Sequence, residues 1–411
     1  MSQLRHVLAA AAILASTGSL VPTSLRAQTE LHPHQEIVWD ESQGGIYELP
    51  ADAYFGASLC AARSGSGRAQ AATTNAHGRA TLELVDDQWS VVSQSPNTEG
   101  PQLFACGHDS EGPNLVTTIR RPGNTHRALS VPSGGLQFDG ISGESVTAIA
   151  RYGNLVAVGQ PTYGAGGAVS FYRRDAGGAW NFERRFDGAI GAELGSSVLV
   201  LGENLAIVGA PSLAHNGEVW IAYTDPTTGS FNRLLEGPAF GNDIRFGRSL
   251  AVDGPWLAVG APFYDRLLAG GGVWEDAGAV YLYEWNGFGW EHSITLTGNT
   301  PDGLLGIRID LRVFAGGDAM LVAGAPGELG TNGNARVYVH ENGGWGLRYR
   351  LADDEGVAAD FAGLGVAIAA PSRVLIGSPG KDKGVVLAFR VPVFADGFES
   401  GDLGAWSAAF P

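Results

Sequence analysis

Sulfur and lysine are both scarce in this 411-residue chain, which contains two cysteines, two methionines and only two lysines, Lys381 and Lys383. Asp and Glu together number 42 against 26 Lys and Arg, so the formal net charge is −16. A folded protein with this balance repels phosphate backbones, and we therefore expect no nucleic-acid partner.

Long hydrophobic runs are also missing after the first 27 residues. Residues 1–27 begin with Arg5 and His6, continue with the mostly apolar stretch 7–21 and end at the small residue Ala27, a pattern that predicts a secretory signal peptide. A membrane anchor is the alternative, but the apolar stretch is short and interrupted by Ser, Thr and Gly. We expect an exported protein, either secreted, at the cell surface or in the periplasm, whose mature chain has no membrane span.

Two cysteines are too few to form the disulfide framework of a chain this long. Cys60 and Cys106 can pair with each other in an exported protein. They can equally remain as two buried free thiols, because cysteine packs as a small hydrophobic residue. The sequence leaves both possibilities open.

Glycine, in contrast, is abundant, with 61 residues, and it accompanies a hydrophobic content of 44%, which is ample for a core. The glycines fall in a repeated pattern. A Phe-Gly or Leu-Gly type element precedes an apolar segment ending in Gly-Ala-Pro or a close variant, and a Val-Tyr-Leu-Tyr type segment follows. The apolar segments of five repeats are Leu155–Pro161, Leu205–Pro211, Leu257–Pro262, Met320–Pro326 and Val374–Pro379.

Each repeat contains four short apolar segments, too short for helices and bounded by Gly and Pro, which indicates β-strands. An aromatic residue opens each unit at intervals of roughly fifty residues. These residues are Trp39, Trp89, Trp180, Phe231, Trp290 and Trp345, with a degenerate start near Phe138. We predict an all-β, seven-bladed β-propeller of four-stranded antiparallel blades over residues 39–391. Residues 28–38 form a lead-in and residues 392–411 a short C-terminal tail.

The repeated motifs resemble FG-GAP repeats, most clearly in units three to seven. In Phe246-Gly-Arg-Ser-Leu250, Leu257-Ala-Val-Gly-Ala-Pro262 and Gly278-Ala-Val-Tyr-Leu-Tyr283 the pattern is nearly complete. This resemblance implies the propeller fold of integrin α subunits and of many secreted bacterial proteins. It implies a binding or adhesion role, but it does not identify a partner.

The calcium-binding form of this repeat carries an Asp-rich loop before the Gly-Ala-Pro segment, where oxygen ligands alternate along the chain. Tight-turn sequences replace that loop here. They are Tyr152–Asn154, Gly202–Asn204, Asp253–Pro255, Gly316–Asp318 and Ala370–Ser372. We therefore expect the short-turn bacterial subtype, with no bound metal and no cofactor.

Signatures of catalysis are largely missing: the chain has no Gly-x-Ser-x-Gly, no Cys-x-x-Cys and no His-Glu-x-x-His. We expect a monomeric binding or adhesion scaffold for an extracellular protein or glycan, without catalysis. One alternative is an enzyme, such as a lyase or glycosidase, that uses the central channel. The other is a purely structural surface protein.

The longest loop after a Gly-Ala-Pro segment, residues 263–277, holds the best candidates for binding. Aromatic rings beside carboxylates suit a sugar or a basic peptide, although a solvated loop without a partner is the alternative. The candidate residues are Tyr264, Asp265, Trp274, Glu275 and Asp276. A second acidic group, Asp353–Glu355 with Asp360, is expected to be only a solvated charged turn.

Overall fold

The computed structural model describes residues 29–392 with gaps. The described ranges are 29–38, 58–61, 68–72, 78–86, 88–96, 104–108, 115–121, 125–131, 138–142 and 146–392 without 214–215, 226, 240–242, 315–316, 329, 331, 354, 371 and 383. The predicted signal peptide and the tail after Pro392 lie outside these residues.

All regular elements among the described residues are β-strands, and they form seven sheets of four or five strands and one two-stranded sheet. The first strands are β3 (Ser58–Ala61), β7 (Phe104–His108), β11 (Ala148–Tyr152), β15 (Ser197–Gly202), β19 (Ser249–Asp253), β25 (Ile309–Val313) and β29 (Gly365–Ala370). The second strands are β4 (Arg68–Ala72), β8 (Leu115–Arg121), β12 (Leu155–Gln160), β16 (Leu205–Ala210), β20 (Trp256–Ala261), β26 (Ala319–Ala325) and β30 (Arg373–Ser378).

The third strands are β5 (Gly78–Val85), β9 (Thr125–Val131), β13 (Ala168–Arg174), β17 (Glu218–Tyr223), β23 (Ala279–Trp285), β27 (Asn334–Glu341) and β31 (Val385–Arg390). The fourth strands are β6 (Gln88–Pro96), β10 (Phe138–Ser142), β14 (Trp180–Asp187), β18 (Ser230–Glu236), β24 (Trp290–Thr297), β28 (Gly344–Leu351) and β2 (Gln35–Val38). Neighbouring strands within these sets of four are antiparallel, whereas β1 (Thr29–Leu31) joins β28 in parallel as a fifth strand. Each sheet is named below by its first strand.

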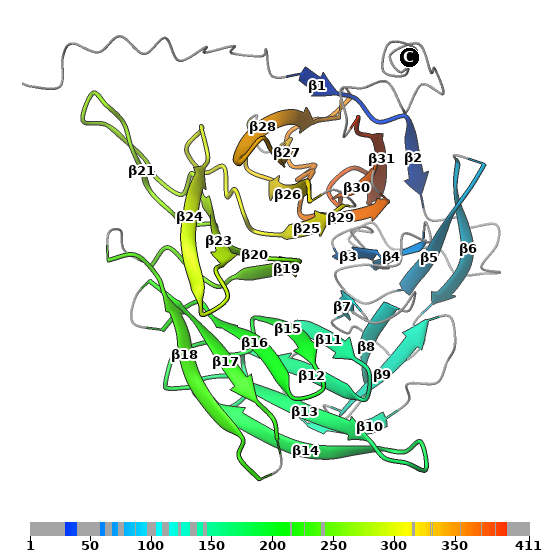
Figure 1. Cartoon of the computed structure of the whole chain (residues 1–411). Helices are drawn as coiled ribbons and strands as arrows, with labels where there is room; N and C mark the ends of the chain where they lie inside the picture. The colour runs from blue at the N-terminus through cyan, green and yellow to red at the C-terminus, as the bar shows by residue number, and fades with distance from the viewer. Residues whose placement is uncertain are drawn as a thin grey trace, which may run out of the picture.

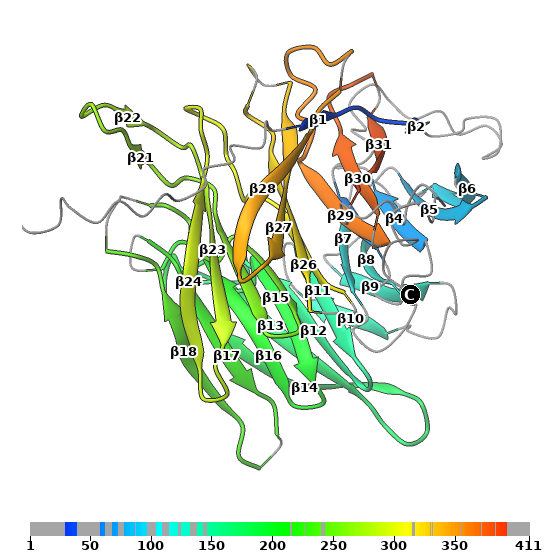
Figure 2. The same ribbon diagram turned by 45° about the horizontal axis from the view of Figure 1, so that its top comes forward.

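The sheets follow one another around a common centre, and their first strands lie nearest to it (Figure 1). Each first strand contacts the first strand of the next sheet, and β29 contacts β3. The view in Figure 2 shows the sheets side by side, with hairpins extending at both ends. The prediction of an all-β chain built from antiparallel four-stranded sheets is confirmed, and the arrangement is propeller-like.

The burial of each strand follows its place in the sheet. Every residue of β12, β20 and β26 is buried, as expected for strands covered on both faces. The aromatic-led strands β14 and β24 are half-exposed, as their alternating sequences predict. In all five clear repeats the second strand ends at the residue before proline, which cannot donate a hydrogen bond to the ladder.

Each sequence unit, as defined above by its opening aromatic residue, begins one strand earlier than the sheet that contains its other strands. The aromatic residue that opens a unit lies on or just after the fourth strand of the preceding sheet, as Trp290 does on β24. The last sheet therefore takes its fourth strand, β2, from the N-terminal end of the chain, antiparallel to β31. Residues 28–38, expected as a lead-in, thus supply strands to two sheets, and the sheets begin before the predicted boundary at residue 39.

Both packing and charge hold β2 in place. Ile37 is buried and lies opposite Val386 of β31. The ammonium group of Lys381 forms ion pairs with Glu36 of β2 and with the buried Asp353, the second at 2.7 Å. These contacts hold β2 against β31, although the two strands lie about 350 residues apart in the sequence. The strand β2 thereby completes the last sheet.

The repeated glycines meet at the contacts between neighbouring sheets. The motif glycine that precedes β15, β19, β25 or β29 directs its carbonyl oxygen against the glycine of the Gly-Ala-Pro element, or its variant, in the preceding sheet, where a Cβ atom would overlap that oxygen. The four pairs are Gly195 with Gly159, Gly247 with Gly209, Gly306 with Gly260, and Gly363 with Gly324. The preceding motif glycines have φ angles near 90°, a conformation open to glycine.

At two of these joints, the serine of the Phe-Gly-x-Ser type motif in the preceding sheet donates a hydrogen bond to the inserted carbonyl. The Ser197 hydroxyl donates to the Gly247 carbonyl at 2.7 Å, and the Ser249 hydroxyl donates to the Gly306 carbonyl at 2.7 Å. Both serines are buried, so each bond satisfies a polar group that water does not reach. The Phe-Gly-x-Ser and Gly-Ala-Pro elements therefore form one joint between consecutive sheets.

The first and second strands are joined by short hairpins, as predicted. Two residues separate β11 from β12, β15 from β16, β19 from β20 and β29 from β30. Gly153 and Gly254 adopt positive φ angles of 51° and 52° in two of these turns.

Replacing a glycine of the joint should destabilise the protein far more than replacing a glycine outside it. Gly209→Ala places a methyl group against the Gly247 carbonyl and the Ser197 hydroxyl. We expect the free energy of unfolding, measured by denaturant titration, to fall by about 3 kcal/mol. Gly346→Ala is the control, because Gly346 lies in β28 with open space around it. Equal losses in the two variants would contradict this account of the joint.

The structure decides between the two possibilities that the sequence left open for the cysteines. Cys60 is buried on β3 and is disulfide-bonded, and Cys106 on β7 is the only other cysteine in the sequence. Because β3 contacts β7, we expect non-reducing peptide mapping to find Cys60 linked to Cys106 within one chain. Cys60→Ala should lower the free energy of unfolding by about 4 kcal/mol, the loop-closure contribution for this separation. A disulfide-linked dimer would contradict the prediction.

Candidate functional site

The loop predicted to carry binding residues folds into a hairpin that extends away from its sheet (Figure 2). Its strands are β21 (Arg266–Leu267) and β22 (Val273–Trp274), and they pair antiparallel. Leu267 lies opposite Val273, and these side chains are 77% and 47% exposed. The hairpin therefore presents a pair of apolar side chains to solvent.

Trp274 is held at the hairpin by its cross-strand neighbour, Arg266. The guanidinium carbon of Arg266 lies 5.3 Å from the centre of the Trp274 ring, a cation–π contact. Arg266 also donates a hydrogen bond to the Gly298 carbonyl at 2.7 Å, which ties the hairpin to the segment after β24. One face of the Trp274 ring is thus already covered within the chain.

Tyr264 supports the hairpin at its base and is not presented at its tip. It is half-buried and packs against the core of the β19 sheet, with its ring edge-on to Tyr281 at 6.3 Å between centroids. Its backbone carbonyl accepts a hydrogen bond from Gly278 at 3.0 Å. Tyr264 and Trp274 were both predicted to contact a partner. In the structure Tyr264 packs against the core and Trp274 packs against Arg266.

Carboxylates surround the base of the hairpin. Asp265 accepts a hydrogen bond from the Asp276 backbone N–H at 3.0 Å, and this bond closes the hairpin. Burial raises the pKa of Asp276, and the charges of Asp265, Asp302, Glu275 and Asp243 raise it further. The three predicted acidic residues therefore lie together, in a group whose mutual repulsion opposes folding.

Among the described residues, no three His, Cys, Asp or Glu side chains are arranged so that they could hold a metal ion. In the same part of the chain, no helix has the length and apolar character needed to cross a membrane.

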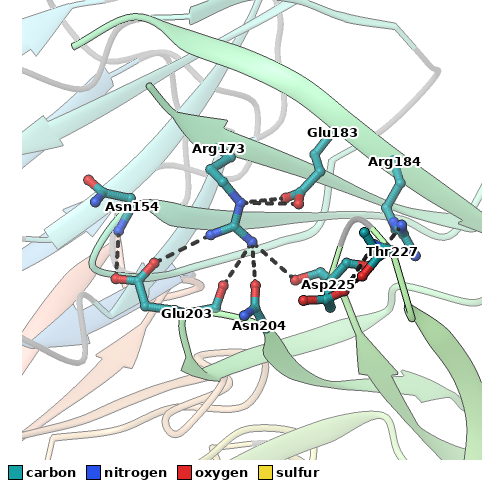
Figure 3. Close-up of polar contacts among 9 residues, drawn as sticks. Asn154, Arg173, Glu183, Arg184, Glu203, Asn204, Asp225 and Thr227 are labelled. Carbon is teal, nitrogen blue, oxygen red and sulfur yellow. Dashed lines mark hydrogen bonds and ion pairs between the residues drawn. The ribbon is translucent and has the colours of Figure 1, made fainter. Parts of the chain in front are cut away.

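A second polar cluster, which the sequence did not indicate, joins the β11 and β15 sheets (Figure 3). Arg173 on β13 contacts both carboxylate oxygens of Glu183 at 3.0 and 3.1 Å. It also donates to the Glu203 carboxylate at 3.4 Å, to the Glu203 carbonyl at 2.8 Å and to the Asn204 side chain at 2.8 Å. All three nitrogens of its guanidinium are occupied, so this cluster is a structural link between sheets.

The prediction of a solvated charged turn at residues 353–360 is wrong for two of its acids. The Asp353 side chain is 4% exposed and pairs with Lys381 at 2.7 Å. Asp360 is 2% exposed, and its carboxylate accepts the Val357 N–H at 2.7 Å. Asp360 can be buried because its partner Val357 lies in the same turn. Asp353 can be buried because it pairs with Lys381, 28 residues further along the chain.

Removing the charge of Asp276 should stabilise the protein at neutral pH. A carboxyl group with a raised pKa in the folded state binds its proton more tightly there, so folding stability falls as pH rises from about 3.8 through the raised value. We expect Asp276→Asn to have a higher melting temperature than wild type at pH 7 and no advantage near pH 3.

Asp382→Asn is the matched control for this prediction. Asp382 has a φ angle of 51°, close to the 49° of Asp276, and it is exposed. Asparagine tolerates this conformation, so both variants keep the backbone. An equal gain in the two variants, or a gain for Asp276→Asn that does not depend on pH, would show that repulsion within the acidic group is unimportant.

Comparisons with known proteins leave the family open. The chain matches no family model, and no curated protein matches it. The resemblance to FG-GAP repeats therefore stays a prediction, which rests on the motifs and on their repeated spacing.

Proposed function

We propose that the chain is an exported, seven-bladed FG-GAP β-propeller that acts as a protein-binding or adhesion scaffold without catalysis. The seven-fold repeat of the sequence motifs and the cyclic contacts between first strands support the propeller. The strand β2 would then close the ring, because it completes the last blade from the opposite end of the chain. A closed ring of this kind is a rigid support for loops.

The single observation that carries the binding role is the hairpin formed by β21 and β22. A two-stranded hairpin gains little stability by itself, and exposed apolar side chains at its tip add none. Leu267 and Val273 nevertheless face each other at that tip, 77% and 47% exposed. Together they form a small apolar surface, called here the hairpin tip, which is held away from the sheets.

The chemistry around the hairpin tip favours a protein partner over a glycan. Sugars stack on free aromatic faces, but one face of Trp274 is covered by Arg266 and Tyr264 is packed into the core. Acidic groups at Asp265, Glu275 and Asp276 favour basic side chains, whose charge would relieve the repulsion on Asp276. The partner we propose is an extracellular protein segment with apolar and basic side chains.

The test is capture of a partner from culture supernatant by the immobilised full chain. We expect the double variant Leu267→Ser/Val273→Ser to weaken capture at least tenfold, because apolar residues at the centre of an interface carry most of its energy. Phe288→Ser is the matched control, since Phe288 is 97% exposed in the turn between β23 and β24, away from this hairpin. Capture that survives the double variant, or that is lost with Phe288→Ser, would overturn the assignment of the hairpin tip.

Electrostatic attraction provides a second readout on the same partner. Capture by wild type should weaken as salt increases, whereas Asp276→Asn should show a smaller salt dependence. A partner whose capture does not respond to salt would contradict the basic character proposed for it.

A further inference from the structure

The joint between the β25 and β29 sheets lacks the serine found at two neighbouring joints. Ser197 lies opposite Gly209 and Ser249 lies opposite Gly260 in their sheets. At the equivalent position the sequence has Arg308, whose backbone carbonyl accepts the Gly324 N–H at 2.9 Å. Within the described part of the chain its guanidinium donates a single, long hydrogen bond, 3.4 Å, to the carbonyl of the adjacent Ile307.

A second arginine, Arg248, lies near Arg308, because the adjacent Ser249 donates a hydrogen bond to the carbonyl of Gly306, two residues before Arg308. Burial, and after it the positive charge of Arg248, lowers the pKa of Arg308 to about 9. Burial also lowers the pKa of Arg248, with Glu193 opposing the change and Arg245 adding to it. Arg248 directly precedes β19 and Arg308 directly precedes β25, and these first strands contact each other near the centre of the ring (Figure 1).

The acidic groups near this pair are engaged with a third arginine. Glu193 forms an ion pair with Arg245 at 2.7 Å, and Asp243 forms another with Arg245 at 3.0 Å. Among the described residues, no ion pair joins a carboxylate to Arg248 or to Arg308. Neither guanidinium group thus has a directly paired carboxylate among the described residues, in a chain of net charge −16.

Such an arrangement is costly unless an anion completes it. Buried charges in proteins are normally paired, and two unpaired like charges add repulsion to the desolvation penalty. The contrast with Arg173 is direct, because its guanidinium contacts the carboxylates of Glu183 and Glu203. Neither Arg248 nor Arg308 is fully enclosed, since each residue is partly exposed.

We propose that Arg248 and Arg308 together bind a small oxyanion at the inner ends of the β19 and β25 sheets. The planar fork of a guanidinium group matches the oxygen spacing of sulfate, phosphate and carboxylate groups and can bind them through two parallel hydrogen bonds. The ligand supplies the negative charge that the chain does not place there. This site is separate from the hairpin tip and does not depend on the proposed partner.

The test uses the full chain and measures melting temperature and calorimetric binding with sodium sulfate, phosphate and acetate at constant ionic strength, with chloride as reference. We expect a saturable rise in melting temperature with sulfate or phosphate, with acetate or with all three, since an anion that binds only the folded state stabilises it. A stronger effect of sulfate and phosphate assigns a tetrahedral oxyanion, and a stronger effect of acetate assigns a carboxylate. Equal behaviour in all four salts would overturn the proposal.

Arg308→Ser is the decisive variant because it restores the residue found at the neighbouring joints. We expect it to bind the anion at least tenfold more weakly, the effect of losing a charge-assisted hydrogen bond. In chloride alone it should melt no lower than wild type, because the serine can bond as Ser249 does. Arg308→Lys, which keeps the charge and loses the fork, should weaken binding to an intermediate extent.

Arg233→Ser controls for the loss of any arginine, since Arg233 is half-exposed and pairs with Glu218 and Glu236 on the outer strands of the β15 sheet. It should keep the full anion response. If both Arg308 variants retain the wild-type response, or if Arg233→Ser abolishes it, the assignment of the site to this arginine pair is wrong.

Discussion

The structure depends on a carbonyl oxygen that enters the preceding sheet. At each of four joints, the oxygen of a motif glycine lies where only a glycine leaves room for it, and at two of them a buried serine donates a hydrogen bond to the same oxygen. A methyl group on either side would separate the sheets. The joint therefore explains why Phe-Gly-x-Ser and Gly-Ala-Pro recur together, and why a chain so rich in glycine still forms an ordered core.

Because the joints fix the sheets, the loops are free to depart from the repeat. The β21–β22 hairpin exposes apolar side chains beside mutually repelling carboxylates, and among the described residues neither Arg248 nor Arg308 forms an ion pair with a carboxylate. Each feature costs folding free energy, which is why we propose both as binding sites, since proteins tolerate such costs at functional sites. The two proposed sites lie in different places, one on a projecting loop and one at the inner ends of two sheets.

Local pattern predicted much of the fold. Apolar segments ending before proline became buried second strands, aromatic-led segments became half-exposed fourth strands, and the turn sequences became tight hairpins. The pattern could not show that β2 completes the last sheet, because its partner β31 lies at the other end of the chain. Burial of Asp353 was missed for the same reason, since its partner Lys381 is remote in sequence.

The candidate site was predicted in part. Loop length and composition located residues 263–277, but the prediction emphasised Tyr264 and Trp274, which pack within the chain, and overlooked Leu267 and Val273. The run of glycines at 270–272 between two short apolar segments was the available signal for a hairpin. For the arginine pair the sequence shows only that Arg308 stands where Phe246-Gly-Arg-Ser249 has its serine. The contact between β19 and β25, which brings Arg248 near Arg308, could not be read from the sequence.

X-ray diffraction from crystals of the mature chain tests the central claim most directly. The account predicts a closed ring of seven sheets, each with four antiparallel strands and one extended by β1. It also predicts that β2 is hydrogen-bonded to β31 and that the motif carbonyl at each of the four joints lies against a glycine of the preceding sheet. An open arc of sheets, a different number of sheets, or side chains separating the paired glycines would contradict it.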